Sequence, residues 1–557
     1  MTIAAATDAA ADAFHEIVDQ SRFADRFIFR HVGVADSNAE SIRFSYDKPL
    51  RFKQRACKEV RMSRGGPGSS LQWWQRCILA AASGVLLTLI FPPFGYSWLA
   101  WVALAPLILG LDGAQPATGL FLGWLAGTIQ SLGVTGYWMF RAARDYFALS
   151  AVGAAAFTVG VNQVFVASYY ALFGLAAGLL NRQRSRWLIL PTLFVSAEYL
   201  RAHLLFGNPW ELLGHSQLQP LLMQVCDVTG VYGLSFLLAF TATVVAELRR
   251  ALLPAGIAVL AVLGVLVYGY WRLGGLSSPS AGAVPVALVQ GNLANEQRGR
   301  PEFFSAHLEH YLELTRHMSG PPPALIVWPE NALGFFPMEN PSLVARIGER
   351  LGEMHAALLA GAPRGAGHAG VAAIYNSAYL FQVQGIGAFY DKRVLLPFVE
   401  RFPLRPNDGP FLPGREPTVF GAGNGRFGVL ICYEAIYPHL ARELVQAGAQ
   451  WLVNISNDSW FEAGAGPEQH YQMARFRAVE NRVSLVRVTN SGVSGVIDPS
   501  GRELIRLRER TATAESVTVP IGGAGSFYTH YGDVFALLCI VVSAVGLSTR
   551  LLGLFTH

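Results

Sequence analysis

Residues 426–440 read RFGVLICYEAIYPHL, an apolar run that ends on a cysteine with a tyrosine and a glutamate directly behind it. The apolar run predicts a buried β-strand. A buried strand gains nothing from a carboxylate at its tip, so the pattern also indicates chemistry at the strand end. The simpler interpretation is that Cys432 is a core residue, because a free cysteine behaves as a small hydrophobe. The rest of the chain has to decide between the two.

The region around this stretch, from Val284 onward, alternates short apolar runs with helical segments. The strand-like runs are VPVALVQGN, ALIVWPEN, AALLAGAPR, NSAYLFQ, RFGVLICYE, WLVNISND, SLVRVTNS and SGVIDPSG. Helical segments are expected at 301–318, 341–356, 438–447 and 467–481. Many strands with helices between them predict a layered α/β domain. GNGRFG (423–428) matches GxGxxG but precedes a strand, so we expect a turn there and no dinucleotide site.

The composition of the whole chain is that of a membrane protein. Of its 557 residues, 52% are hydrophobic and 15% are charged, whereas soluble domains are about 25% charged. The basic residues behind the net charge of +5 are scattered, which indicates no nucleic-acid face. The five cysteines show no CxxC spacing, so neither a disulfide framework nor a zinc site is expected.

Apolar stretches of about 18 residues or more are typical of transmembrane helices. They occur at 76–93, 97–112, 117–140, 148–180, 186–206, 218–246, 252–272 and 533–553. These stretches predict a polytopic α-helical membrane domain with about eight spans. The predicted organisation is an N-terminal extension (1–75), a membrane domain (76–280), an α/β outer domain (281–525) and a C-terminal span (526–557).

Basic residues are concentrated in alternate loops. The segment RFKQRACKEVRMSR precedes the first span, and Arg182, Arg184 and Arg186 follow the fourth. The positive-inside rule therefore predicts a cytoplasmic N-terminus and an outer domain on the periplasmic side. Residues 1–70 contain neither a span nor a cleavable signal pattern, and Met62 opens a short basic lead into the first span, which suggests the hypothesis that translation starts at Met62.

Three reactive side chains follow strand-like runs of the outer domain: Glu330, Lys392 and Cys432. Lys392 is the only lysine after Lys58, in a chain that otherwise uses arginine. A carboxylate can take the proton of a thiol, and an ammonium group can stabilise negative charge on a carbonyl oxygen. Each residue alone is compatible with a structural role, as a helix cap, a solvated charge or a core residue. The three together predict acyl transfer.

These residues carry a resemblance to a known family. WPE, DK followed by LLPF and Glu400, and CYE resemble the nitrilase superfamily with its Glu-Lys-Cys triad. The spans are similar to those of its membrane-bound branch, the apolipoprotein N-acyltransferases, as are GNPWELLGHSQ (207–217), VALVQGN (286–292), NISNDSWF (454–461), QHYQMARFRAVENR (469–482) and TNSGVSGVIDPSG (489–501). The resemblance covers about residues 76–553. It implies a four-layer αββα nitrilase-like outer domain over a membrane base.

The resemblance also implies an activity in the bacterial inner membrane. An acyl chain would pass from a phospholipid to the α-amino group of a diacylglyceryl-cysteine at an apolipoprotein N-terminus, through a thioester on Cys432. Glu330 would be the general base and acid, and Lys392 with the backbone N–H of Tyr433 would hold the oxyanion. Glu400 and Glu434 would position Lys392. No metal or cofactor is expected, and the protein is expected to be a monomer.

The chain departs from the family pattern at two places. The family usually has PFGE where this chain reads PFVE (397–400), so Val399 places a bulkier side chain beside Glu400. A tryptophan commonly follows the QGN segment, whereas here the chain continues LANEQRGR after Asn292. The sequence therefore does not predict which lipid contacts that loop makes.

Two other functions are compatible with parts of the sequence. A membrane-tethered amidase or nitrilase acting on a small amide needs the same triad but not the spans. A transporter-like or lipid-binding scaffold would carry charged residues inside its spans, and those found there are few, such as Glu198, Arg201 and Asp227, mostly near the ends. Acyl transfer between two lipid-anchored substrates accounts for both the triad and the membrane base.

Overall fold

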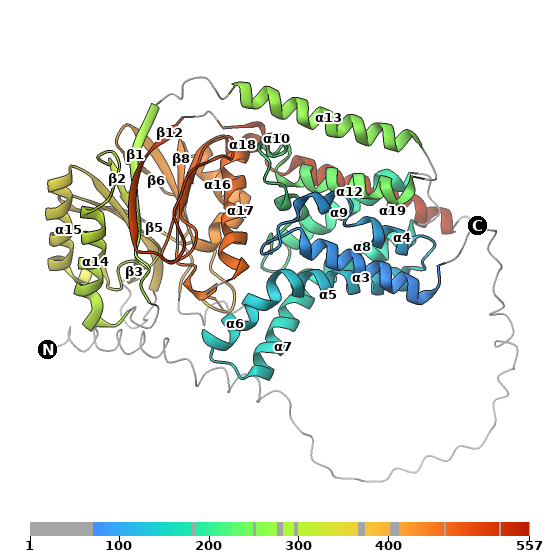
Figure 1. Cartoon of the computed structure of the whole chain (residues 1–557), viewed down its shortest axis with the longest axis horizontal. Helices are drawn as coiled ribbons and strands as arrows, with labels where there is room; N and C mark the ends of the chain where they lie inside the picture. The colour runs from blue at the N-terminus through green and yellow to red at the C-terminus, as the bar shows by residue number, and fades with distance from the viewer. Residues whose placement is uncertain are drawn as a thin grey trace, which may run out of the picture.

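The computed structural model describes residues 71–180, 185–248, 252–275, 282–294, 299–365, 374–401, 411–461, 464–522 and 525–555. The chain forms a helical part and a part built on two β-sheets, which lie side by side (Figure 1). The hypothesis of a start at Met62 and nearly all of the predicted N-terminal extension lie outside the described residues.

The helical part contains a helix in each interval where a span was predicted. Its helices are α3 (Trp73–Leu89), α4 (Ala105–Leu111), α5 (Pro116–Ser131), α6 (Tyr137–Asp145), α7 (Ala151–Asn162), α8 (Ser168–Leu179), α9 (Arg186–His203), α10 (Pro220–Met223), α11 (Cys226–Thr229), α12 (Val231–Glu247), α13 (Leu252–Gly275) and α19 (Val534–Phe555). Two π-helical segments, η3 (Leu132–Gly136) and η4 (Gln163–Ala167), join α5 to α6 and α7 to α8.

Fewer of these helices are long and apolar enough to cross a membrane than the sequence predicted. Within the described ranges three qualify, at Pro116–Asp145, Ala151–Leu179 and Leu252–Gly275. A fourth qualifies if Pro220–Thr229 and Val231–Glu247, which are bent by 115°, count as one broken span. The prediction of about eight spans is therefore supported only in part.

Glycines allow α5 and α8 to pack closely. A Cβ added at Gly119 would lie 2.2 Å from the backbone oxygen of Gly174, and one at Gly123 would lie 2.1 Å from that of Tyr170. Small residues at such spacing let helix backbones approach each other, as is common between membrane helices. The sequence TGLFLGWLAG therefore sets the spacing of this helix pair, on which the nearby η3 and η4 segments depend.

The other part has two six-stranded sheets. The first has the order β12 (Thr513–Ile521), β1 (Gly282–Gln290), β2 (Leu325–Val327), β3 (Ala357–Gly365), β4 (Ile374–Gln382), β5 (Gly385–Asp391). The second has the order β11 (Glu503–Arg506), β10 (Gly495–Ile497), β9 (Ser484–Thr489), β8 (Trp451–Ser456), β7 (Gly425–Ile431), β6 (Val419–Ala422). In each sheet three strands are parallel, β1, β2 and β3 in the first and β7, β8 and β9 in the second.

The buried residues show how the layers stack. One cluster lies between the sheets and joins Val286 and Leu359 of the first to Val429 and Val486 of the second. Helices α14 (Phe304–Arg316) and α15 (Pro341–Met354) cover the other face of the first sheet, and α16 (Pro438–Gln446) and α17 (Ala465–Asn481) cover that of the second. The order is therefore helix, sheet, sheet, helix, as predicted for a nitrilase-like fold.

Helix α17 also faces the helical part. Almost all of its residues are buried, although it is rich in polar side chains. Its C-terminal Arg482 donates to Asp227 of α11, with 2.8 Å between Nε and Oδ2. The α16–α17 layer thus lies between the second sheet and the membrane helices (Figure 1).

The GxGxxG segment forms a hairpin turn, as predicted. Ala422 of β6 pairs with Gly425 of β7, and Gly423 between them has a φ of 57°. A positive φ is the conformation for which glycine is suited. The segment therefore serves chain reversal at a sheet edge.

Candidate active site

The structure brings Glu330, Lys392 and Cys432 to one cavity. Glu330 lies in the turn after β2, Lys392 directly follows β5, and Cys432 begins the 3₁₀ segment η9 (Cys432–Ile436) after β7. All three line a cavity of about 560 Å³ and are at most 4% exposed. Strand ends of both sheets thus supply the reactive groups, because the parallel strands of each sheet end at the same edge.

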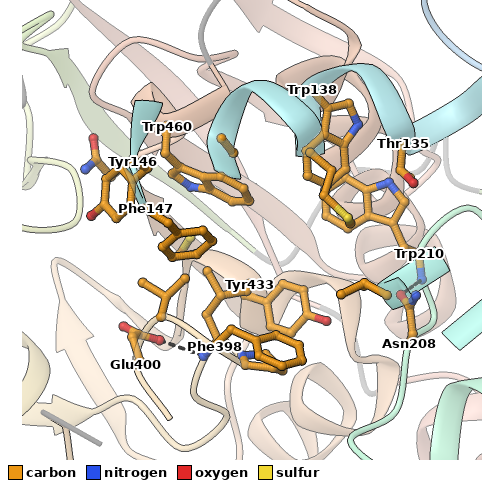
Figure 2. A pocket seen from close by; sticks show the side chains of 18 of the residues that line it. Thr135, Trp138, Tyr146, Phe147, Asn208, Trp210, Phe398, Glu400, Tyr433 and Trp460 are labelled. Carbon is orange, nitrogen blue, oxygen red and sulfur yellow. Dashed lines mark hydrogen bonds between the residues drawn. The ribbon is translucent and has the colours of Figure 1, made fainter. Parts of the chain in front are cut away.

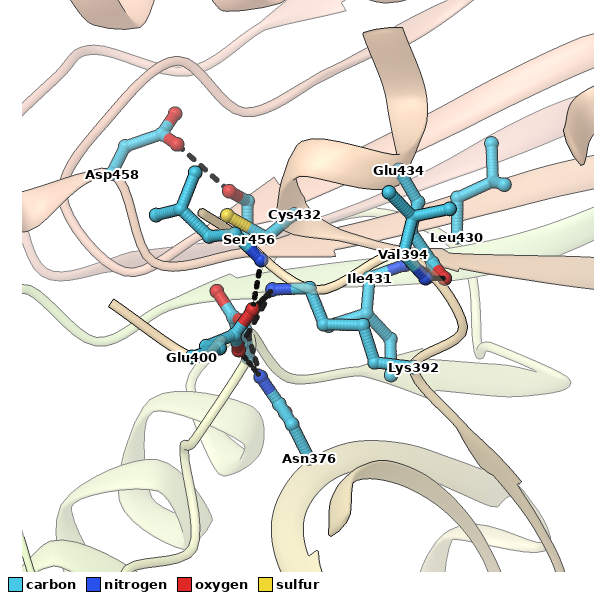
Figure 3. Close-up of polar contacts among 12 residues, drawn as sticks. Asn376, Lys392, Val394, Glu400, Leu430, Ile431, Cys432, Glu434, Ser456 and Asp458 are labelled. Carbon is cyan, nitrogen blue, oxygen red and sulfur yellow. Dashed lines mark hydrogen bonds and ion pairs between the residues drawn. The ribbon is translucent and has the colours of Figure 1, made fainter. Parts of the chain in front are cut away.

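Lys392 is held between two carboxylates. Its Nζ lies 3.2 Å from Oε1 of Glu330 and 2.8 Å from Oε2 of Glu400. The Asn376 amide donates to Oε1 of both glutamates, at 2.8 Å each (Figure 3). Burial alone would lower the pKa of Lys392, but the two carboxylates outweigh it and hold that pKa well above its usual value. Lys392 is therefore a fixed ammonium group at neutral pH.

Cys432 has an unusual backbone for a residue with a side chain. Its φ is 52°, in the left-handed region that side chains normally avoid. Its carbonyl accepts hydrogen bonds from Asn454 Nδ2 at 3.3 Å and from His470 Nε2 at 3.1 Å. Burial and the nearby Glu330 carboxylate raise the pKa of the Cys432 thiol, which Lys392 opposes. The resting thiol is therefore protonated, and a base must take its proton before it can attack as a thiolate.

Glu434 connects the cysteine turn to the lysine segment. Its carboxylate accepts backbone N–H bonds from Ile431 at 2.7 Å, Arg393 at 2.6 Å and Val394 at 3.1 Å. The Tyr390 hydroxyl donates to both carboxylate oxygens. Burial raises the pKa of the Glu434 carboxyl, and the backbone bonds counteract that rise. A carboxylate at the tip of this strand thus fixes the backbone on either side of the reactive pair.

Segments of the helical part form the rest of the cavity wall. Aromatic and aliphatic side chains dominate it, among them Trp138, Phe147, Phe157, Phe165 and Trp210. Figure 2 shows the rings of Trp138, Phe147 and Trp210 across the cavity from Tyr433 and Phe398. Phe398, from the segment after β5, contacts Phe157 of α7 edge to face, with ring centroids 5.4 Å apart. The reactive groups therefore open onto an apolar chamber.

Two sequence departures can be placed in this wall. Val399 lines the cavity beside Glu400, and its N–H contacts the Leu396 carbonyl at 3.4 Å. Part of the loop after Asn292, residues 295–298, lies outside the described residues. Among the residues that the structure describes, no group of three or more His, Cys, Asp or Glu side chains could hold a metal ion.

Both parts of the chain match known protein families. Residues 83–244 match the apolipoprotein N-acyltransferase N-terminal domain, and residues 285–527 match the carbon-nitrogen hydrolase family. An apolipoprotein N-acyltransferase from Geobacter metallireducens is 36% identical over 503 residues, which are 84% of this chain and 94% of that protein. One from Allorhizobium ampelinum is 32% identical over 523 residues, which are 86% and 98%. The chain belongs to the apolipoprotein N-acyltransferase family.

Solved structures are more distant from this apolipoprotein N-acyltransferase family member. An amidase from Nesterenkonia sp. is 19% identical and covers 45% of this chain and 95% of its own, with a TM-score of 0.34. A CN-hydrolase superfamily protein from Xanthomonas campestris is 20% identical and covers 43% and 91%, with a TM-score of 0.34. Likenesses of this size carry no conclusion about function.

Several residues that the sequence did not single out complete the site of this family member. Asn376 bridges the two glutamates, and Asn454 and His470 hold the Cys432 carbonyl. Behind them, Arg487 lies 2.6 Å from Asp458. Asn454 and Asp458 lie in the motif NISNDSWF, and His470 lies in QHYQMARFRAVENR. Neither motif indicates by itself which of its polar side chains faces the cysteine.

Proposed function

We propose that this protein transfers a fatty acyl chain from a membrane phospholipid to the α-amino group of the diacylglyceryl-cysteine at the N-terminus of an apolipoprotein. The observation that carries the proposal is the shared cavity. Glu330, Lys392 and Cys432 lie on one side of it, and apolar side chains of membrane helices form the other. A cavity of this kind suits a reactive ester whose long acyl chain stays in an apolar surrounding.

In the first step Cys432 attacks the ester carbonyl of the phospholipid. Glu330 takes the thiol proton as sulfur bonds to the carbonyl carbon, and the carbonyl oxygen becomes an oxyanion. The Lys392 ammonium stabilises this oxyanion together with the backbone N–H of Tyr433, which lies in the first turn of η9 and has no partner within that turn. When the tetrahedral intermediate collapses, Glu330 returns the proton to the leaving alkoxide, and a lysophospholipid departs.

In the second step the α-amine of the acceptor attacks the Cys432 thioester. Glu330 accepts a proton from the amine, and the same oxyanion contacts stabilise the new intermediate. Expulsion of the Cys432 thiolate, which takes the proton back from Glu330, leaves an amide on the acceptor and restores the enzyme. Glu400 and Glu434 act through Lys392, the first by direct contact at 2.8 Å and the second by fixing the N–H groups of the next two residues.

The proposal includes the membrane arrangement predicted from the sequence. About eight spans in the bacterial inner membrane, a cytoplasmic N-terminus and a monomer with its outer domain on the periplasmic side would place the cavity where both lipid-anchored substrates reach it. Exposed apolar residues along α13, such as Leu260 and Val267, support a lipid-facing surface for that helix.

A transfer assay tests the proposal against the amidase alternative. Purified protein in vesicles that contain phospholipid with a labelled acyl chain is mixed with a diacylglyceryl-peptide, and the label on the peptide is measured. A parallel reaction measures ammonia release from small amides. Transfer without amide hydrolysis is expected. Amide hydrolysis without transfer would replace the proposed function with that of a membrane-tethered amidase.

A further inference from the structure

Two consecutive residues of α17 contact the two sides of the catalytic cavity. Gln469 points toward the membrane helices, and His470 points toward the cysteine turn. Both are at most 1% exposed. Helix α17 lies between the second sheet and the helical part, so one turn of it reaches both.

All hydrogen-bonding atoms of the Gln469 amide have partners. Its Oε1 accepts the indole N–H groups of Trp138 at 3.1 Å and Trp210 at 3.0 Å. Its Nε2 donates to the carbonyls of Pro92 at 2.9 Å and Val134 at 3.0 Å. Both tryptophans line the cavity, and their rings lie 5.4 Å apart. Val134 belongs to the π-helical segment η3 of the same wall, so a single amide contacts three residues that line the apolar chamber.

His470 has polar partners at both of its ring nitrogens. A carbonyl only accepts hydrogen bonds, so the contact with Cys432 O places the proton on Nε2. Nδ1 lies 3.0 Å from Nη2 of Arg487 and 3.1 Å from Oδ1 of Asp458, and Arg487 also donates to Asp458. Burial and the Arg487 guanidinium lower the pKa of His470, and the Asp458 carboxylate opposes that shift. The imidazole therefore presents a fixed N–H to the carbonyl of a residue whose φ is 52°.

We propose that Gln469 and His470 are a pair of positioning residues, in which Gln469 shapes the acyl chamber through Trp138 and Trp210 while His470 holds the Cys432 backbone in its reactive conformation. Neither residue touches the reacting atoms. The proposal rests on the proposed function for its account of the chamber. The separate roles of the two residues, one in the shape of the chamber and one in the geometry of the thiol, follow from their contacts alone.

Thiol alkylation separates the two roles without requiring acyl transfer. N-ethylmaleimide needs access to Cys432 and an ionised thiol in a reactive position, whereas N-hexadecylmaleimide also has a chain that must enter the chamber. Modification of Cys432 is followed by peptide mass spectrometry, with Cys432→Ser as the blank. In His470→Phe the rate with both reagents should fall on the order of 100-fold, because a displacement of about 1 Å at a reacting atom has that effect. In Gln469→Met the hexadecyl reagent alone should slow, by about tenfold, as expected for loss of one well-made hydrogen bond in a recognition site.

Controls distinguish positioning from damage to the fold. Gln472→Met changes a partly buried glutamine of the same helix that contacts Glu468 instead, and it should leave both rates unchanged. His470→Gln keeps an N–H donor and should recover much of the rate lost in His470→Phe. If a variant does not fold, Trp210→Phe for the chamber and Asn454→Ala for the cysteine carbonyl test the same two contacts.

The two variants should also affect different steady-state constants of acyl transfer, kcat in one case and the apparent KM for phospholipid in the other. His470→Phe should lower kcat with little change in the apparent KM for phospholipid, and Gln469→Met should raise that KM with little change in kcat. Equal effects of Gln469→Met on both maleimides, or unchanged alkylation in His470→Phe, would overturn the inference. Parent protein that alkylates as described but transfers no acyl chain would refute the proposed function instead.

Discussion

The two sides of the cavity are held by different kinds of contact. On the sheet side, Glu330, Lys392, Glu400 and Glu434 are linked by short ion pairs and by backbone N–H bonds. On the membrane side, ring contacts such as that between Phe157 and Phe398 form most of the wall, and the Gln469 amide holds its two tryptophans. Hydrogen bonds are directional and fix atoms closely, whereas apolar contacts depend on volume and tolerate similar shapes. Changes on the sheet side should therefore affect the rate of chemistry, and changes on the membrane side should affect substrate fit.

The largest effect is expected at Cys432, the proposed nucleophile. Cys432→Ser should lower acyl transfer on the order of 1,000-fold or more, because a hydroxyl is far harder to ionise than a thiol of pKa about 8.5. Oxygen is close in size to sulfur, so folding and membrane insertion should persist. Transfer is measured from labelled phospholipid to a diacylglyceryl-peptide, with Cys77→Ser, a half-buried cysteine of α3, as the matched control. Undiminished transfer by Cys432→Ser would make Cys432 a core residue.

Lys392→Arg should have the next largest effect. The positive charge remains, but the planar guanidinium does not fit the space between Glu330 and Glu400 that the ammonium occupies at 3.2 and 2.8 Å. We expect a fall in turnover on the order of 100-fold, the usual size for loss of one oxyanion contact. Turnover is measured at saturating phospholipid, and a value within about threefold of the parent would remove Lys392 from the mechanism.

Glu434→Gln should lower turnover by about tenfold while the protein stays folded. The amide NH₂ of glutamine would face an N–H donor where the carboxylate now accepts from Ile431, Arg393 and Val394. The backbone beside Lys392 and Cys432 should shift as a result. Glu313→Gln, at an exposed glutamate of α14, is the control. Full activity in Glu434→Gln would mean that the carboxylate only ends the strand.

The smallest effect is expected on the membrane side. Phe157→Ala removes the ring that contacts Phe398 and should raise the apparent KM for phospholipid by about threefold to tenfold, with kcat nearly unchanged. Val152→Ala, at a position of α7 that is 80% exposed, should leave KM unchanged. A loss of kcat at constant KM in Phe157→Ala would contradict the division of roles between the two sides.

The sequence was informative where apolar runs end on reactive groups. The runs before Glu330 and Cys432 form the buried strands β2 and β7, and the run before Lys392 forms the partly exposed edge strand β5. The three side chains line one cavity. The missed strands, β6, β11 and β12, lie at sheet edges, and their partly exposed positions are less uniformly apolar than those of central strands. Edge strands therefore give a weak periodic signal.

Two features could not be predicted because they depend on tertiary contacts. Asn376, Gln469 and His470 are ordinary polar residues in sequence. Asn376 gains its partners where β4 meets Glu330 and Glu400, and Gln469 and His470 gain theirs from the packing of α17 between a sheet and a helical bundle. The helical intervals were predicted, but breaks such as the 115° bend between Pro220–Thr229 and Val231–Glu247 are not encoded in hydropathy. Apolar content predicts where helices lie and not how each one is divided.

The most direct test of the central claim is to look for the acyl-enzyme. Purified protein is incubated with phospholipid without an acceptor and then digested, and the masses of its cysteine-containing peptides are measured by mass spectrometry. The Cys432 peptide should gain the mass of one acyl chain, lose it on treatment with hydroxylamine, and lose it on addition of a diacylglyceryl-peptide. Full transfer to the acceptor with no acyl group ever found on Cys432, or with one on another cysteine, would contradict the account.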